Sequence, residues 1–115
     1  MREPDMFEPM ICYLKKSGYT ILQVNRGVQR GPDILAEKNK RKFVIQMKGD
    51  SAAIKTDWDT GLGQLLDMMD YEDADYAIAV SESYGRLVES FPSYPKNRLR
   101  LTFFIVKDYG VVERV

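Results

Sequence analysis

Apolar and polar residues alternate most regularly along residues 33–48. Two alternating runs, 33–38 and 41–48, flank Asn39-Lys40, a pair that can form a tight turn. This pattern predicts an antiparallel β-hairpin. Pairing the strands across that turn places the apolar residues on one face: Ile34, Ala36, Phe43, Ile45 and Met47. A slip of one residue would mix the two faces, so the alternation also predicts the register.

The second face of this hairpin is polar. Glu37 lies opposite Lys42 as a cross-strand pair of opposite charge, and Asp33 lies opposite Gln46, with Lys48 two residues further along. Directly opposed residues have Cβ atoms about 5 Å apart. Asp33 and Gln46 are therefore close enough to share a cation, and the hairpin holds the first candidate site.

Hydrophobic periodicity outside the hairpin predicts further helices and strands. Helices are expected at residues 6–17, from Thr56 onward and at 83–91, and strands at 19–24, 76–80, 99–106 and 111–115. Residues 25–32, 93–98 and 107–110 are expected to be loops or turns. The predicted order is α-β-β-β-α-β-α-β-β, a mixed sheet flanked by helices. The fold class is therefore α/β or mixed α+β rather than a doubly wound parallel sheet, in one domain over residues 1–115.

The second predicted helix has Thr56 as its expected N-cap and a stripe of apolar residues at helical spacing. Gln64 lies on the opposite side of this helix from that stripe. Gly61 and Gly63 are unfavourable inside a helix, which predicts that another backbone or a ligand approaches closely there.

Composition removes several function classes. The chain has no histidine, which excludes Ser-His-Asp and Cys-His catalysis and histidine-ligated zinc. Its single cysteine excludes an internal disulfide and favours a cytoplasmic location. A formal net charge of zero means that any nucleic-acid binding depends on a local basic patch. No apolar run reaches membrane-spanning length, and carboxylate and lysine chemistry remains, with or without a hard cation.

Each of the three candidate residues on the hairpin also has an explanation that requires no functional site. Asp33 follows Gly-Pro, where acidic residues are common in turns, and Lys48 ends a strand, where lysines are commonly solvated. Gln46 is harder to dismiss, because it interrupts an apolar run and a buried amide needs a hydrogen bond or a ligand. The coincidence of all three on one hairpin face favours a site.

Pro32-Asp33, the hairpin and Gln46-Met47-Lys48 resemble the signature of the PD-(D/E)XK nuclease superfamily, in the Gln-x-Lys form of its Mrr-like branch. Holliday-junction resolvases are relatives of this branch. The predicted element order is similar to the restriction-endonuclease-like core from about residue 7 to 106. Phe7-Glu8 is similar to the family's first helix, whose glutamate joins the metal site. Residues 58–69 resemble the second core helix, which often carries a glutamine near the site, here Gln64.

The resemblance implies a metal-dependent endonuclease that hydrolyses DNA phosphodiesters. It implies Mg²⁺ or Mn²⁺ held by Asp33, Gln46, the main-chain oxygen of Met47 and Glu8. Lys48 would orient the attacking water or stabilise the developing negative charge. Gln46 in place of an acid removes one charge from the ligand set.

DNA is the expected partner, with no membrane, and a domain this small is expected to work as a homodimer or in a larger assembly. Candidate DNA-binding residues are Arg26, Arg30 and Lys55, followed by Lys96, Arg98 and Arg100. Two other readings stay open. One is a nuclease-fold module without activity that binds nucleic acid or a partner protein, and the other is a small α+β interaction domain.

Overall fold

The computed structural model describes residues 1–27, 30–70 and 73–115. The helices of four or more residues are α1 (Glu3–Lys16), α2 (Ile54–Asp67), α3 (Gly85–Glu89) and α4 (Ser93–Arg98). The strands are β1 (Thr20–Val24), β2 (Ile34–Lys38), β3 (Arg41–Lys48), β4 (Ala74–Ser81), β5 (Leu101–Val106) and β6 (Val112–Arg114). Two 3₁₀ turns, η1 (Glu82–Tyr84) and η2 (Asp108–Gly110), complete the described elements.

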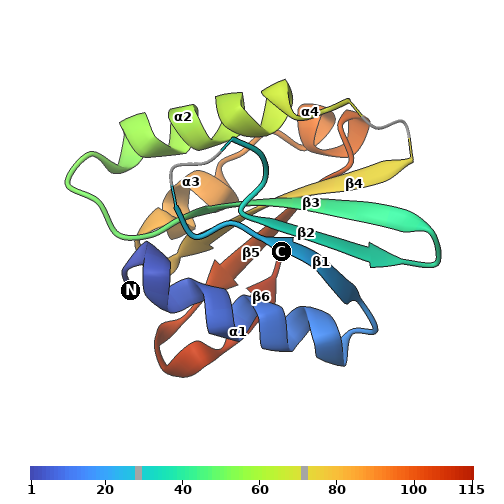
Figure 1. The fold of residues 1–115 in the computed structure, drawn as a ribbon. Helices are drawn as coiled ribbons and strands as arrows, with labels where there is room; N and C mark the ends of the chain where they lie inside the picture. The colour runs from blue at the N-terminus through green and yellow to red at the C-terminus, as the bar shows by residue number, and fades with distance from the viewer. Residues whose placement is uncertain (28–29, 71–72) are drawn as a thin grey trace.

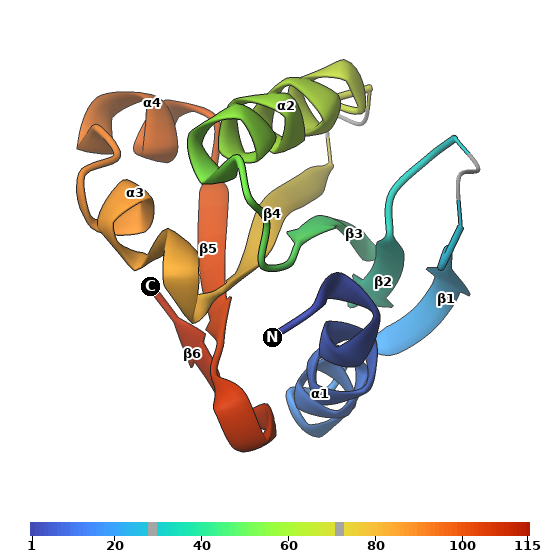
Figure 2. The same ribbon diagram turned by 90° about the vertical axis from the view of Figure 1, so that its left-hand side faces the viewer.

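All these strands form one mixed sheet in the order β1-β2-β3-β4-β5-β6. The strands β3, β4 and β5 run parallel, and the pairs at both edges of the sheet are antiparallel. Helix α1 covers one face, whereas α2, α3 and α4 lie against the other (Figures 1 and 2). Alternate residues of β3 therefore enter different cores, with Phe43 and Ile45 packed under α1 and Val44 under α2. The predicted mixed α/β architecture is confirmed.

The hairpin of β2 and β3 has the predicted register. Ile34 pairs with Ile45, Ala36 pairs with Phe43, and Glu37 pairs with Lys42. The Lys42 Nζ lies 2.8 Å from the Glu37 Oε2. The turn residues Asn39 and Lys40 have positive φ angles of 54° and 63°, which is the conformation that suits a two-residue hairpin turn.

Helix α1 begins three residues earlier than predicted, at Glu3 rather than at residue 6. Pro4 lies in its first turn, and Pro9 lies inside the helix. A proline in a helix interior costs about 3 kcal/mol. Four residues of α1 are buried in the core: Met6, Phe7, Met10 and Leu14. Burial of each such side chain stabilises by roughly 1.5–3 kcal/mol, so packing outweighs the cost of Pro9.

Other boundaries also differ from prediction. Helix α2 begins at Ile54, preceded by Ala53, so Thr56 lies inside the first turn and is not the N-cap. Residues 93–98 form α4 instead of a loop, and the helix expected at 83–91 divides into η1 and α3. The loop expected at 25–32 includes residues 28 and 29, which lie outside the described residues, as do residues 71 and 72. No helix in the described ranges is long and apolar enough to cross a membrane.

Candidate active site

A cleft of about 690 Å³ opens where β2 begins and β3 ends. Its walls come from the first turn of α1, the segment between β1 and β2, strand β3 and helix α2. Side chains that line it include Glu3, Arg30, Asp33, Gln46, Lys48 and Gln64. The predicted trio of Asp33, Gln46 and Lys48 therefore meets in one cavity, on the side of the sheet that α2 covers.

Asp33 is fixed by main-chain hydrogen bonds at the start of β2. Its carboxylate Oδ2 accepts a 2.7 Å hydrogen bond from the Met47 N–H, and its main-chain oxygen accepts one of 2.8 Å from the Asn25 N–H. The β2–β3 ladder begins at Ile34 opposite Ile45, so Met47 extends past the start of β2. The Asp33 side chain thus occupies the position that a further ladder bond would take.

Gln46 carries a buried polar atom without a partner. Its side chain is 7% exposed, and its Nε2 donates a 3.0 Å hydrogen bond to the Gln64 Oε1. Within the described ranges, the Gln46 Oε1 has no hydrogen-bond partner. A buried carbonyl oxygen left unsatisfied costs about 1–3 kcal/mol. Gln46 lines a cleft together with the carboxylates of Glu3, Asp33 and Asp67, so its oxygen is available to a cation or a water molecule.

Gly61 makes room for the Lys48 side chain. A Cβ atom at Gly61 would lie 3.1 Å from the Lys48 Cγ, 3.2 Å from its Cε and 3.0 Å from the Ile78 Cδ1. The aliphatic stem of Lys48 therefore crosses α2 where that helix has no side chain. The sequence predicted that another backbone or a ligand approaches Gly61 and Gly63; the structure instead places two side chains against Gly61, and a Cβ at Gly63 would meet nothing within 4 Å.

Glu3 enters the cleft from the first turn of α1. Gly49, directly after Lys48, allows this approach, because a Cβ atom there would overlap the Glu3 nitrogen and Cα. The Tyr84 hydroxyl donates a 2.8 Å hydrogen bond to the Gly49 oxygen and holds that backbone in place. The sequence interpretation missed Glu3. The available signal was Pro4, which favours the first turn of a helix, where acidic residues are also common.

The carboxylates of Glu3 and Asp33 share a partly desolvated environment. Burial raises the pKa of Asp33, and the hydrogen bond from Met47 and the charge of Lys48 oppose that rise. Burial also raises the pKa of Glu3, the Asp33 carboxylate raises it further, and Lys48 opposes both effects. Both groups therefore hold their protons more tightly than free carboxylates, and a bound cation would remove this penalty.

Glu8 does not enter the cleft. Its side chain is 78% exposed, and its Oε1 lies 2.6 Å from the Arg26 Nη2. The Arg26 guanidinium lies 4.9 Å from the centre of the Phe7 ring. Glu8 follows Glu3 by five positions in the helix, so the Glu8 side chain points about 140° away from that of Glu3 around the axis of α1. The structure therefore corrects the expectation for Glu8: this residue lies outside the cleft, and Glu3 lines it instead.

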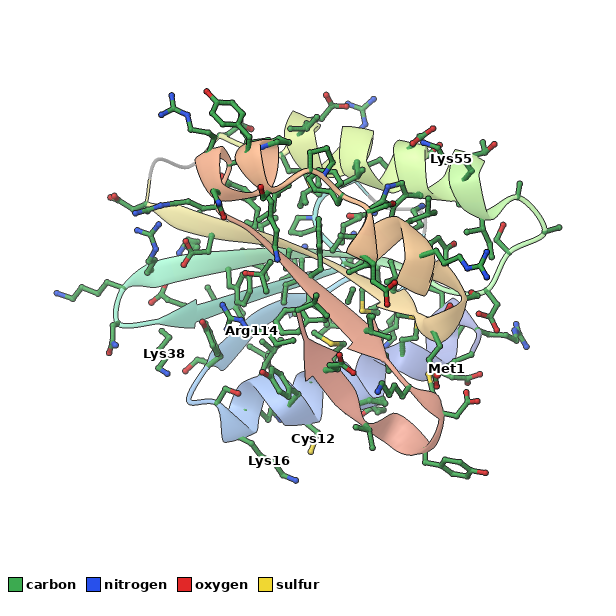
Figure 3. All side chains as sticks on the ribbon, turned by 180° about the vertical axis from the view of Figure 1, so that it is seen from behind. Met1, Cys12, Lys16, Lys38, Lys55 and Arg114 are labelled. Carbon is green, nitrogen blue, oxygen red and sulfur yellow. The ribbon has the colours of Figure 1, made fainter. Side chains whose placement is uncertain are left out.

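The three candidate DNA-binding residues lie in different surroundings. Arg30 lines the cleft, and Arg26 is paired with Glu8. Lys55 projects from the start of α2 and lies 2.6 Å from the Asp59 Oδ1 (Figure 3). Only Arg30 therefore adds a positive charge next to Asp33 and Lys48.

The donor set of the cleft suits a hard cation. Among the described residues, no group of three or more His, Cys, Asp or Glu side chains could hold a metal ion by itself. The cleft is lined by the carboxylates of Glu3 and Asp33, by the side chain of Gln46 with its unpartnered Oε1, and at the end of α2 by a third carboxylate, Asp67. Magnesium binds oxygen ligands and commonly keeps several waters, so such a set fits it.

Comparisons with known proteins agree with this fold. An XisH family protein from Nostoc punctiforme is similar in structure, with a TM-score of 0.65, 16% identity, and coverage of 94% of this chain and 95% of that chain. An fdxN element excision controlling factor protein from Anabaena variabilis has a TM-score of 0.65 and 21% identity, with the same coverage of 94% and 95%. At these identities the likeness shows the fold alone. No curated protein matches the chain.

A family model described as restriction endonuclease, Mrr_cat, matches residues 1–85. This segment is most of the chain and contains every cleft residue named above. It also contains the Gln46-Met47-Lys48 motif and the helix that carries Gln64. The chain belongs to the Mrr_cat restriction endonuclease family.

Proposed function

We propose that this protein is an endonuclease that hydrolyses DNA phosphodiester bonds with Mg²⁺ or Mn²⁺ in the cleft. The observation that carries the proposal is the buried, unpartnered Oε1 of Gln46, which lines a cavity together with Glu3 and Asp33. Family membership supports a nuclease, and this donor set supports the use of a metal. The ion, when bound, would acidify the attacking water and offset negative charge on the phosphate.

Asp33, Gln46 and Glu3 would hold the metal, with the main-chain oxygen of Met47 as a further ligand. The Met47 N–H points toward Asp33, and the N–H and C=O of one strand residue point to the same side. Lys48 would orient the water or stabilise negative charge on the phosphate oxygens. Gln64 fixes the amide of Gln46 so that the oxygen, not the nitrogen, is free.

Glu3 and Glu8 provide a matched pair of variants. Glu3→Gln is expected to weaken Mn²⁺ binding about tenfold or more and to lower DNA cleavage accordingly, because it removes one of the two carboxylates proposed to hold the metal. Glu8→Gln removes the same charge from an exposed position on the same helix. Isothermal titration with Mn²⁺, followed by cleavage of supercoiled plasmid, compares the two variants. Equal effects of both substitutions would contradict the assignment of Glu3.

Gly61 and Gly63 provide a second matched pair. Gly61→Ala is expected to displace Lys48 and to lower the cleavage rate by about tenfold, because small misplacements of a catalytic group are costly. Gly63→Ala meets open space, so cleavage should be unchanged and the helix should gain about 1 kcal/mol of stability. Cleavage rates and melting temperatures of both variants check this. Full activity of Gly61→Ala would contradict the role given to the Lys48 position.

Cleavage of supercoiled plasmid with Mg²⁺ or Mn²⁺, and its absence with EDTA, is the direct test of the function. DNA binding without cleavage under all these conditions would instead identify an inactive nuclease-fold module. On the same proposal, the working unit on DNA is a homodimer or part of a larger assembly. A single domain with Arg30 as the added cation at its cleft provides little surface for a duplex.

A further inference from the structure

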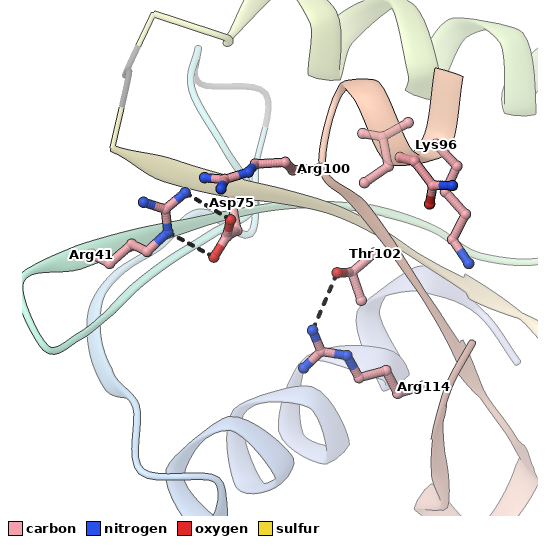
Figure 4. Close-up of a pocket in the computed structure, with 8 residues that line it drawn as sticks. Arg41, Asp75, Lys96, Arg100, Thr102 and Arg114 are labelled. Atoms are coloured by element: carbon pink, nitrogen blue, oxygen red, sulfur yellow. Dashed lines mark hydrogen bonds and ion pairs between the residues drawn. The ribbon is translucent and has the colours of Figure 1, made fainter. Parts of the chain in front are cut away.

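A second cleft, of about 570 Å³, lies at the opposite end of the central strands (Figure 4). It is lined by Arg41, Asp75, Lys96, Arg100, Thr102 and Arg114, among others. We call it the basic cleft. Arg41 begins the strand that Lys48 ends, and seven residues of extended chain span about 23 Å. The basic cleft is therefore separate from the metal site proposed above.

Positive charge is in excess in the basic cleft. Its one lining carboxylate, Asp75, is bound by Arg41 through two hydrogen bonds of 3.0 Å, with the Arg41 Nε and Nη2 as donors. Asp73 also lies near Arg41. In the described part of the chain, Lys96, Arg100 and Arg114 form no ion pair with a side-chain carboxylate. Three cations thus line this cleft without an ion pair to a side-chain carboxylate, beside the single lining carboxylate of Asp75.

Two of these cations are held in place on aromatic rings. The Lys96 Nζ lies 5.3 Å from the centre of the Phe103 ring and donates a 3.1 Å hydrogen bond to the main-chain oxygen of Val115. The Arg114 guanidinium lies 5.8 Å from the Phe104 ring, and its Nη2 donates to the Thr102 Oγ1 at 3.4 Å. Since Phe103 and Phe104 belong to opposite cores, the two cations approach β5 from both faces of the sheet.

Arg100 gives the strongest indication that the basic cleft binds a ligand. It follows the Leu99 C-cap of α4 with a positive φ of 55°. Glycine or asparagine usually occupies this left-handed position, and a long side chain there costs free energy. Arg100 is exposed and makes no side-chain hydrogen bond or ion pair within the described ranges, so no contact in the fold explains its presence.

We propose that the basic cleft binds backbone phosphates of a nucleic acid at a point remote from the metal site. Guanidinium groups match phosphate oxygens in geometry and charge, and this lining is mainly polar and cationic. The span of about 23 Å between the clefts equals about seven nucleotide steps of one DNA strand at 3.4 Å each. This spacing is within the reach of one bound duplex, and Arg100 supplies a positive charge that no ion pair in the described part of the chain uses.

Two substitutions at Arg100 separate binding from folding. Both Arg100→Gln and Arg100→Gly are expected to weaken binding of a fluorescent 24-base-pair duplex about fivefold and to lower the salt-dependence slope by about one unit. Arg100→Gly alone should raise the melting temperature, because it removes the strain of the positive φ. Arg86→Gln removes one charge from an exposed position on α3 and should leave binding unchanged.

Fluorescence anisotropy in EDTA measures this binding without any contribution from metal or cleavage. Loss of cleavage with intact binding would then count against the proposed function alone. Duplex affinities of both Arg100 variants within twofold of the unmodified chain would overturn the basic cleft as a nucleic-acid site. Absence of duplex binding by the unmodified chain at low salt would overturn it as well.

Discussion

Lys48→Met is expected to lower the rate of DNA cleavage by about 10²–10³-fold, which is the usual effect of removing one group that stabilises transition-state charge. Methionine retains most of the aliphatic stem that crosses Gly61, so packing against α2 should survive. Removing an ammonium group from beside Asp33 and Glu3 cannot weaken their attraction for a cation. Mn²⁺ affinity at pH 8 should therefore stay the same or increase. Single-turnover cleavage and Mn²⁺ titration measure the two effects.

The combination of lost cleavage and retained metal binding is specific to a catalytic lysine. Lys16→Met, on the last turn of α1, removes a comparable exposed lysine and serves as the control (Figure 3). Unchanged cleavage by Lys48→Met would exclude Lys48 from the chemistry. Loss of Mn²⁺ binding together with cleavage would show that the Lys48 ammonium group supports the structure of the site and has no separate role in the chemistry.

The hairpin and its polar face could be predicted because they depend on local alternation. A one-residue slip would have placed Glu37 on the apolar face, so the sequence allowed a single consistent register. The same register brought Asp33 close to Gln46. The hydrogen bond from the Met47 N–H to Asp33 could not be predicted, because it depends on where pairing between β2 and β3 stops.

The first helix shows where local signals mislead. The predicted helix began at residue 6, and the family resemblance placed Glu8, in its first turn, at the site. Tertiary packing of Met6, Phe7, Met10 and Leu14 instead extends the helix back to Glu3. The contact that positions Glu3 involves Gly49, 46 residues later in the chain. No local pattern reports such a contact.

The sequence did not predict helix α4 or the basic cleft. Pro95 in residues 93–98 was consistent with a loop, although proline is equally compatible with the first turn of a helix. Arg100 and Lys96 were noted as candidate cations without a location. The parallel pairing of β4 with β5, and the antiparallel pairing of β5 with β6, bring Asp75 and Arg114 to the same end of the sheet as these cations.

Asp33→Asn is expected to abolish DNA cleavage and to weaken Mn²⁺ binding by more than tenfold, while raising the melting temperature of the metal-free protein at pH 8. The amide oxygen of asparagine can still accept the Met47 N–H that Asp33 Oδ2 accepts at 2.7 Å. The variant therefore keeps the local structure and loses a charge whose burial is unfavourable. Stability gained together with function lost is typical of a site built to hold a cation.

The pH dependence of this gain has a definite sign. Because burial raises the Asp33 pKa in the folded state, the folded protein binds the proton more tightly than the unfolded chain does. The contribution of Asp33 to the stability of the unmodified protein should therefore fall as pH rises from about 4, the ordinary aspartate pKa, through the raised folded value. Asp33→Asn should lack the Asp33 contribution to this fall and keep that of Glu3, so the two proteins should converge in melting temperature toward pH 3. At the same concentration, Mn²⁺ should stabilise the unmodified protein more than the variant, and equal stabilisation of both would exclude Asp33 as a metal ligand.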